Sequence, residues 1–157
     1  TAPFPGFPTD LQAPFMALMT IAKGRSKISE TIFENRMTHV DLLNKMGAEI
    51  IVKNNTAYIN GVKKLKGMNL VGSDLRSSAA LIIAALISEN ISHIYGLEHL
   101  DRGYEDFEFK LSQLGAQITR VTTRKQINES NYESHELTKK VSAISAAWIL
   151  KLKRRLC

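Results

Sequence analysis

The sequence predicts an α/β (α+β) domain in which helices pack together on the faces of sheets. Three observations lead to this class: helical and strand-like segments alternate, a block of motifs occurs twice, and residues 75–88 form a helical segment that is apolar almost all round. Alternation is typical of mixed folds, and a helix without a polar face is expected at the centre of a domain. The chain has 157 residues, 44% of them hydrophobic, which suffices for one ordinary domain.

The repeated block defines two similar units. Ser73-Asp74-Leu75-Arg76 and the apolar run behind it align with Thr9-Asp10-Leu11-Gln12, 64 residues earlier. A unit of this length is longer than a solenoid repeat. We therefore expect two similar units, about 9–72 and 73–121, built around a shared core.

The first unit is predicted to begin with a helix. Pro14 lacks a backbone N–H and is tolerated in the first turn of a helix, so the helix should run from about Pro14 to Gly24. Asp10 then lies at or just before the N-terminus of this helix, a position suited to caps and anions. Residues 27–33 alternate like a half-buried strand.

A second helix and a hairpin complete the first unit. Residues 40–46 carry apolar side chains at helical spacing, and Gly47 follows them as a C-cap. Residues 49–53 and 56–59 flank Asn54-Asn55, which is a hairpin signal.

The second unit follows a polar connection at residues 63–67 and repeats the order of elements. A helix is predicted first, then a strand, a helix closed by Gly115, and a strand. Their predicted ranges are 75–88, 92–97, about 104–114 and 117–121.

The composition changes after Val121. Residues 1–121 are predicted to form the partial domain, 122–131 a polar linker, and 135–157 a basic amphipathic helix within a tail of residues 122–157. Residues 121–157 carry 8 Lys and Arg against 3 Asp and Glu, hence +5 of the net charge of +6. This uneven charge does not favour a nucleic-acid partner. The tail helix is expected to pack on the domain or fray, and membrane-surface binding is the weaker alternative.

Several classes of protein are not favoured by the sequence. We find no apolar run of membrane-spanning length and no signal peptide, so a cytoplasmic protein without a membrane span is expected. Cys157 is the only cysteine, and the four histidines show no paired metal spacing, so no metal site is expected. No phosphate-binding glycine loop or nucleophile elbow occurs, and no cofactor is expected.

Charged residues gather at corresponding ends of the two units. Asp10 and Asp74 precede helices, Arg76 lies in the first turn of the second of these, and Arg36 and Arg102 follow strands. Guanidiniums beside helix N-termini suit phosphate or carboxylate ligands, and a carboxylate among them can act as a general base. Taken singly, each aspartate is more often a capping residue and each arginine a surface ion-pair partner.

Five motifs, in order and at matching spacing, closely resemble the UDP-N-acetylglucosamine enolpyruvyl transferase family. The resemblance covers residues 1 to about 121, and it implies inside-out α/β repeats in a two-domain enzyme of which this chain matches the C-terminal part of the second domain. The motifs are Thr1-Ala2-Pro3-Phe4-Pro5-Gly6-Phe7-Pro8-Thr9-Asp10-Leu11-Gln12-Ala13, Glu30-Thr31-Ile32-Phe33-Glu34-Asn35-Arg36, Met46-Gly47-Ala48, Ser73-Asp74-Leu75-Arg76-Ser77-Ser78-Ala79 and Asp101-Arg102-Gly103-Tyr104-Glu105.

The resemblance also implies a reaction and roles for individual residues. The enolpyruvyl group of phosphoenolpyruvate would be transferred to the 3′-hydroxyl of UDP-N-acetylglucosamine, committing the sugar to peptidoglycan. Asp10 matches the family's carboxylate that takes the hydroxyl proton. Ile32 matches a position whose backbone contacts the nucleotide sugar, and Arg102 matches an arginine that binds phosphoenolpyruvate. Polar residues of the same cleft are matched by Asp74, Arg76 and Arg36.

The chain departs from the family in two ways. The first domain, with its acid cysteine, is absent, so a separate chain carrying it is an expected partner. The tail beyond residue 121 matches nothing we associate with the family. Two alternatives therefore stay open: a non-catalytic remnant or binding subunit, and the related enzyme that acts on 3-phosphoshikimate.

Overall fold

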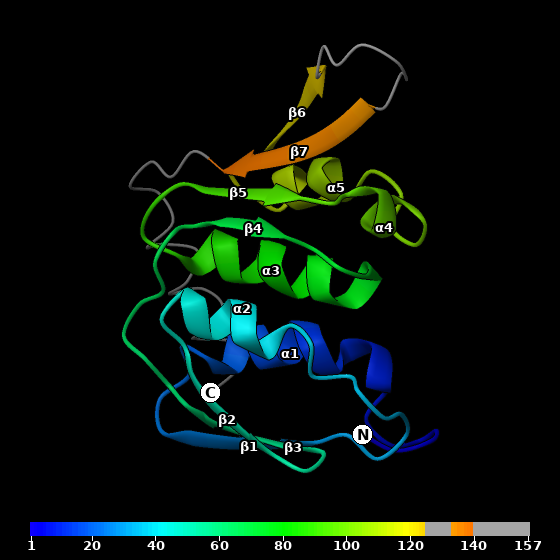
Figure 1. The fold of residues 1–157 in the computed structure, drawn as a ribbon, viewed down its shortest axis with the longest axis vertical. Coiled ribbons are helices and arrows are strands. Elements are labelled where there is room, and N and C mark those ends of the chain that lie inside the picture. The colour runs from blue at the N-terminus through cyan, green and yellow to red at the C-terminus, as the bar shows by residue number, and fades with distance from the viewer. Residues whose placement is uncertain (125–132, 140–157) are drawn as a thin grey trace.

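The middle layer of the molecule is helical, and a sheet lies on either side of it (Figure 1). The computed structural model describes residues 1–124 and 133–139. Three helices, α1 (Gln12–Met19), α2 (Val40–Lys45) and α3 (Leu75–Ile87), occupy the middle layer between two sheets (Figure 1). This arrangement confirms the predicted mixed class with helices packed together on sheet faces.

The first sheet is antiparallel and belongs to the first unit. It consists of β1 (Arg25–Ser29), β2 (Glu49–Lys53) and β3 (Thr56–Asn60) in the order β1-β3-β2. The predicted hairpin is confirmed: β2 pairs with β3, and Asn54 in the turn has a φ of 54°. Asparagine tolerates this left-handed conformation better than most residues.

The second sheet is mixed and has the order β4-β5-β7-β6. The pair β4 (Asn69–Val71) and β5 (Ser92–Tyr95) is parallel, whereas β7 (Glu133–Lys139) pairs antiparallel with both β5 and β6 (Thr119–Arg124). The parallel pair is connected through α3, as parallel strands require a crossover.

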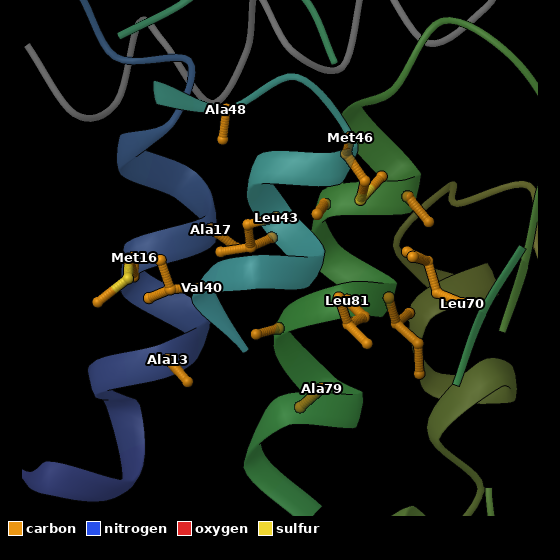
Figure 2. Close-up of a cluster of buried hydrophobic side chains, with 14 of the residues drawn as sticks. Ala13, Met16, Ala17, Val40, Leu43, Met46, Ala48, Leu70, Ala79 and Leu81 are labelled. Carbon is orange, nitrogen blue, oxygen red and sulfur yellow. The ribbon is translucent and has the colours of Figure 1, made fainter. Parts of the chain in front are cut away.

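One hydrophobic core joins the two units. Helix α3 is buried at its centre, as predicted, and contacts α1. Figure 2 shows side chains of all three inner helices in one cluster, among them Met16, Leu43 and Leu81, each with no more than 1% of its surface exposed. Burial of each such side chain stabilises the fold by about 1.5–3 kcal/mol.

Both predicted glycine caps are confirmed, and they have the same geometry. Gly47 and Gly115 have φ of 95° and 89°. Each donates its N–H to the carbonyl three residues earlier, and the alanine after each donates to the carbonyl five residues earlier. This pair of bonds is a Schellman motif, in which a left-handed glycine ends the helix. The superposition of the complete units stays a prediction.

Several element boundaries differ from the predicted ones. Helix α1 ends at Met19, short of Gly24, and two short elements were not predicted: strand β4 and helix α4 (Glu98–Asp101). Helix α5 spans Phe107–Gln113 because Asp106 before it has a left-handed φ of 46°, which excludes it from a helix.

The prediction for the tail is wrong wherever the structure describes it. Residues 122–124 continue strand β6 instead of forming a linker, and residues 135–139 lie in strand β7 instead of a helix. The physical reason is sheet pairing, since β7 supplies backbone partners to both β5 and β6. Residues 125–132 and 140–157 lie outside the described part of the chain, and the domain boundary at residue 121 stays a prediction.

No helix within residues 1–124 and 133–139 has both the length and the apolar character that a bilayer span requires.

Candidate active site

Asp10 stands at the start of the first inner helix. It belongs to a single 3-10 turn, η1 (Thr9–Leu11), which leads directly into α1. The turn places its side chain at the surface, 67% exposed, and no side chain caps α1. Asp10 is therefore not a helix cap, and its carboxylate is available for other partners.

Two guanidiniums converge on the Asp10 carboxylate. Nε of Arg76 donates to Oδ1 of Asp10 at 2.6 Å, and Nη1 of Arg36 donates to the same oxygen at 3.4 Å. The hydrogen bond from Arg76 contributes most to lowering the pKa of Asp10; burial opposes it, and Arg36 adds to it. Asp10 is thus an ionised acceptor near neutral pH.

Asp74 does cap its helix. Oδ1 of Asp74 accepts the N–H groups of Arg76 and Ser77 at 2.9 and 3.0 Å, and Oγ of Ser77 accepts the N–H of Asp74 at 3.1 Å. This capping box fixes the first turn of α3. Burial raises the pKa of Asp74, but the hydrogen bonds of Ser77 and Arg76 outweigh it and hold the pKa below its usual range. The cap orients Arg76 toward Asp10.

Arg36 is positioned by an aromatic ring. It is half-buried, and its guanidinium carbon lies 4.1 Å from the centre of the Phe33 ring, within cation–π distance. Asn35 between them has a φ of 56°, which turns the chain sharply at this point. The turn brings Arg36 to Asp10 from the end of the loop after β1.

The loop after β1 also contains Ile32. Its backbone N–H donates to Oε1 of Glu30 at 2.9 Å. Among the described residues, no group donates to the carbonyl of Ile32. Any backbone contact that Ile32 makes with a ligand therefore has to use this carbonyl.

Arg102 is not brought into contact with the charged residues of the predicted site. It follows α4 and is exposed, and its side chain makes no hydrogen bond or ion pair within the described residues. Gly103 beside it packs so tightly that an added Cβ would lie 2.8 Å from Cδ2 of Leu75, the first residue of α3. Arg102 thus lies beside the N-terminus of α3, with its guanidinium in solvent.

Three residues with structural roles at this end of the molecule were not predicted. They are the buried carboxylate of Glu30, the buried imidazole of His39, and Arg120, which pairs with the residue before Arg102. The sequence offers no signal for them, because their burial depends on residues far away in the chain. Across the described ranges, no group of three potential metal ligands occurs.

The comparison with protein families identifies the fold. A family model described as EPSP synthase (3-phosphoshikimate 1-carboxyvinyltransferase) matches residues 1–111. The chain belongs to this family of enolpyruvyl transferases. The resemblance found in the sequence is therefore confirmed at the level of the family.

Curated relatives narrow the resemblance within the enolpyruvyl transferases. A UDP-N-acetylglucosamine 1-carboxyvinyltransferase of Prochlorococcus marinus subsp. pastoris is 74% identical over 148 residues, 94% of this chain and 32% of the relative. Another of the same name, from Prochlorococcus marinus, is 87% identical over 120 residues, 76% of this chain and 26% of the relative. The chain spans about a third of the length of the relatives it matches. The first alignment reaches past residue 121, so the expectation that the tail matches nothing in the family is wrong.

Solved structures of enolpyruvyl transferases share the fold. The enolpyruvyl transferase NikO from Streptomyces tendae aligns with a TM-score of 0.63 and 32% identity, covering 71% of this chain and 26% of that one. The EPSP synthase from Acinetobacter baumannii aligns with a TM-score of 0.51 and 13% identity, covering 83% of this chain and 46% of that one. At such low identity, the second likeness concerns the fold alone.

Proposed function

We propose that this chain is part of an enzyme that transfers the enolpyruvyl group of phosphoenolpyruvate to the 3′-hydroxyl of UDP-N-acetylglucosamine. The reaction would serve peptidoglycan precursor synthesis in the cytoplasm. The observation that carries the proposal is the Asp10 carboxylate before α1, which is held by the guanidiniums of Arg76, in the first turn of α3, and of Arg36, in the loop after β1. The names of the curated relatives support the choice of nucleotide sugar.

Asp10 is assigned the role of general base. The sugar oxygen bonds to C2 of phosphoenolpyruvate, its proton passes to the Asp10 carboxylate, and another proton is added to the methylene carbon. Loss of that proton and of phosphate then restores the double bond. A positioned base contributes on the order of 10²–10⁴-fold to such a step. The lowered pKa keeps Asp10 ionised and able to accept.

Arg36 and Arg76 are assigned to the anionic groups of the substrates. Both guanidiniums contact Asp10. A phosphate or carboxylate competes for the same donors, since guanidinium binds both in a bidentate way. Drawing the arginines from Asp10 raises the pKa of Asp10 and makes it a stronger base at the moment of binding.

Arg102 is assigned to phosphoenolpyruvate. Its exposed guanidinium has no competing partner among the described residues, and the next residue, Gly103, packs against Leu75 in the first turn of α3, where the helix dipole also favours an anion. A separate chain or segment carrying the remaining two thirds of the enzyme is the proposed partner, because the relatives are about three times as long.

A hybrid enzyme tests the proposal. In it, this chain replaces the matching third of the Prochlorococcus marinus subsp. pastoris relative, and phosphate release is measured with phosphoenolpyruvate and UDP-N-acetylglucosamine. We expect turnover that Asp10→Asn and Arg102→Ala abolish, and that the exposed control Asp41→Asn retains. Replacing the nucleotide sugar with 3-phosphoshikimate should give no turnover.

The isolated 157-residue chain should release no phosphate. Half a cleft cannot hold two substrates in attack geometry, and this geometry is a precondition for the base to act. Turnover by the chain alone would overturn the two-part enzyme. An inactive hybrid would instead favour a non-catalytic binding subunit, and an active Asp10→Asn hybrid would remove the base assignment.

A further inference from the structure

Glu30 is a buried carboxylate whose two oxygens bind two different loops. Its side chain follows β1 and belongs to a residue only 1% exposed. Oε1 accepts the backbone N–H groups of Ile32 and Phe33 at 2.9 and 3.2 Å, and Oγ1 of Thr1 donates to it at 2.7 Å. Oε2 accepts Oγ1 of Thr9 at 2.8 Å. The carboxylate therefore has four donors.

These four donors explain why a charge is tolerated at this depth. An isolated buried carboxylate would be costly, whereas one that accepts several hydrogen bonds is stabilised in its ionised form. Burial raises the pKa of Glu30, but the hydrogen bonds from Thr1, Ile32, Thr9 and Phe33 outweigh it, so its pKa lies below the usual range. The two backbone N–H groups require an acceptor at the position of Oε1.

The two loops that Glu30 joins are those that carry the site. Thr9 directly precedes Asp10 in η1, whereas Ile32 lies in the loop that leads to Arg36. Because Glu30 binds the N–H of Ile32, the carbonyl is the backbone group of Ile32 that stays available to a ligand. Thr9 lies 21 residues before Glu30 in the sequence and binds its Oε2, whereas Ile32 lies two residues after Glu30 and binds its Oε1.

We propose that Glu30 is a positioning residue, which sets the Asp10 carboxylate at a fixed distance from the backbone of Ile32. This inference rests on the proposed function, in which Asp10 takes the proton of the sugar hydroxyl and Ile32 contacts the nucleotide sugar. One buried side chain that touches neither substrate then positions both the Asp10 base and the backbone of Ile32 relative to the nucleotide sugar. A misplacement of about 1 Å in such a constellation can cost about 10²-fold in rate.

The two oxygens of Glu30 can be tested separately in the hybrid enzyme. Thr9→Val removes only the donor beside Asp10, and we expect kcat to fall about 10- to 100-fold with little change in KM for UDP-N-acetylglucosamine. Glu30→Leu removes both contacts, so kcat should fall and that KM should rise. The matched control is Thr56→Val, which removes a hydroxyl that bonds Ser29 Oγ at 3.0 Å in the same sheet.

Glu30→Gln serves as the rescuing variant. Its amide oxygen can accept the two backbone N–H groups while its NH₂ donates to the Thr9 hydroxyl, which can act as either donor or acceptor. Activity should therefore stay within about 10-fold of the unsubstituted hybrid, because the geometry is retained and the general base itself is unchanged. A loss in Glu30→Gln as large as in Glu30→Leu would overturn the positioning role.

A second measurement needs no catalysis and uses the 157-residue chain. Amide hydrogen exchange at Ile32 and Phe33 should be faster in Glu30→Leu than in the unsubstituted chain, and should be unchanged in Thr9→Val. Equal exchange in Glu30→Leu would overturn the proposal even if the hybrid proved inactive. If the hybrid is active and Thr9→Val keeps the kcat of Thr56→Val, the positioning role fails while the proposed function stands.

Discussion

Nε of Arg76 lies 2.6 Å from Oδ1 of Asp10, so a guanidinium in the first turn of α3 reaches a carboxylate 66 residues earlier in the chain. The contact joins the starts of the two inner helices, one from each repeat. It also explains why the two aligned aspartates have different roles. Asp74 caps α3 and so fixes the backbone of Arg76, whereas Asp10 accepts a hydrogen bond from the guanidinium of Arg76.

Removing this guanidinium should raise the pKa of Asp10. The hydrogen bond from Arg76 is the largest cause of the lowered pKa, so in Arg76→Gln the carboxylate should titrate closer to its ordinary value. NMR titration of the Asp10 side-chain carbon in the 157-residue chain measures the change. Arg25→Gln, on the outer sheet, is the control and should leave the titration as it is. An unchanged curve in Arg76→Gln would contradict the structure.

His39 should make the fold sensitive to mild acid. Burial lowers its pKa from 6.5 to about 4, although the charge of Asp74 opposes this. Below pH 6.5 the unfolded chain binds a proton at His39 that the folded chain does not bind. The free energy of unfolding therefore decreases as the pH is lowered. This difference corresponds to about 2 kcal/mol between pH 7 and pH 5.

The measurement is urea unfolding of the 157-residue chain and of His39→Leu at both pH values. The variant should lose most of the difference in unfolding free energy between pH 7 and pH 5. Carboxylates with lowered pKa values, such as Glu30 and Asp74, titrate below this window and interfere little. The same pH dependence in both proteins would show that His39 is solvated when it should be buried.

The parts of the fold that could be predicted are those that depend on local chemistry. The hairpin of β2 and β3 follows from a turn signal between two alternating segments, and α3 from a long apolar run. Strand β4 has three residues and helix α4 has four, so neither is long enough to show a period. Predictions for such short elements need the tertiary contacts that stabilise them.

The predicted strand 27–33 shows how a local bond from a side chain to the backbone can override a pattern. Apolar alternation continues to Phe33, yet β1 ends at Ser29. The N–H groups of Ile32 and Phe33 are bound by the Glu30 carboxylate and are withdrawn from any sheet. Only part of the candidate site could be predicted. The sequence predicted that Asp10 meets Arg36 and Arg76, but the buried groups that hold these residues could not be inferred from spacing.

Arg120 should stabilise the segment that carries Arg102. It donates to Asp101 through Nη1 and Nη2 at 2.9 and 2.7 Å, and Nη2 also donates to Glu108 at 3.0 Å. Its side chain is 22% exposed, so the pairs are partly shielded from water. Arg120→Met should lower the unfolding free energy by about 1–3 kcal/mol. This is the range for losing hydrogen bonds between charged groups and for leaving their carboxylate partners unpaired.

The control for Arg120 is an ion pair near the start of α5 that is open to solvent. Lys110 lies 3.5 Å from Glu105, and their side chains are 60% and 87% exposed. Lys110→Met should change stability by less than about 0.5 kcal/mol, as is usual for exposed ion pairs. Equal effects of the two substitutions in chemical denaturation would show that the Arg120 fork contributes no more than a surface pair.

Deleting residues 123–157 should destabilise the domain, because it removes strand β7. Strand β7 lies between β5 and β6, pairing with residues 92–95 on one side and 119–124 on the other, so its removal exposes the backbone of two strands at once. Each ladder hydrogen bond contributes about 0.5–1.5 kcal/mol, and we expect a loss above about 2 kcal/mol in thermal or urea unfolding. A chain ending at Lys139 keeps every described strand and is the matched control. If the chain ending at residue 122 unfolds at the same midpoint as the control, β7 does not stabilise the sheet, and the expectation is wrong.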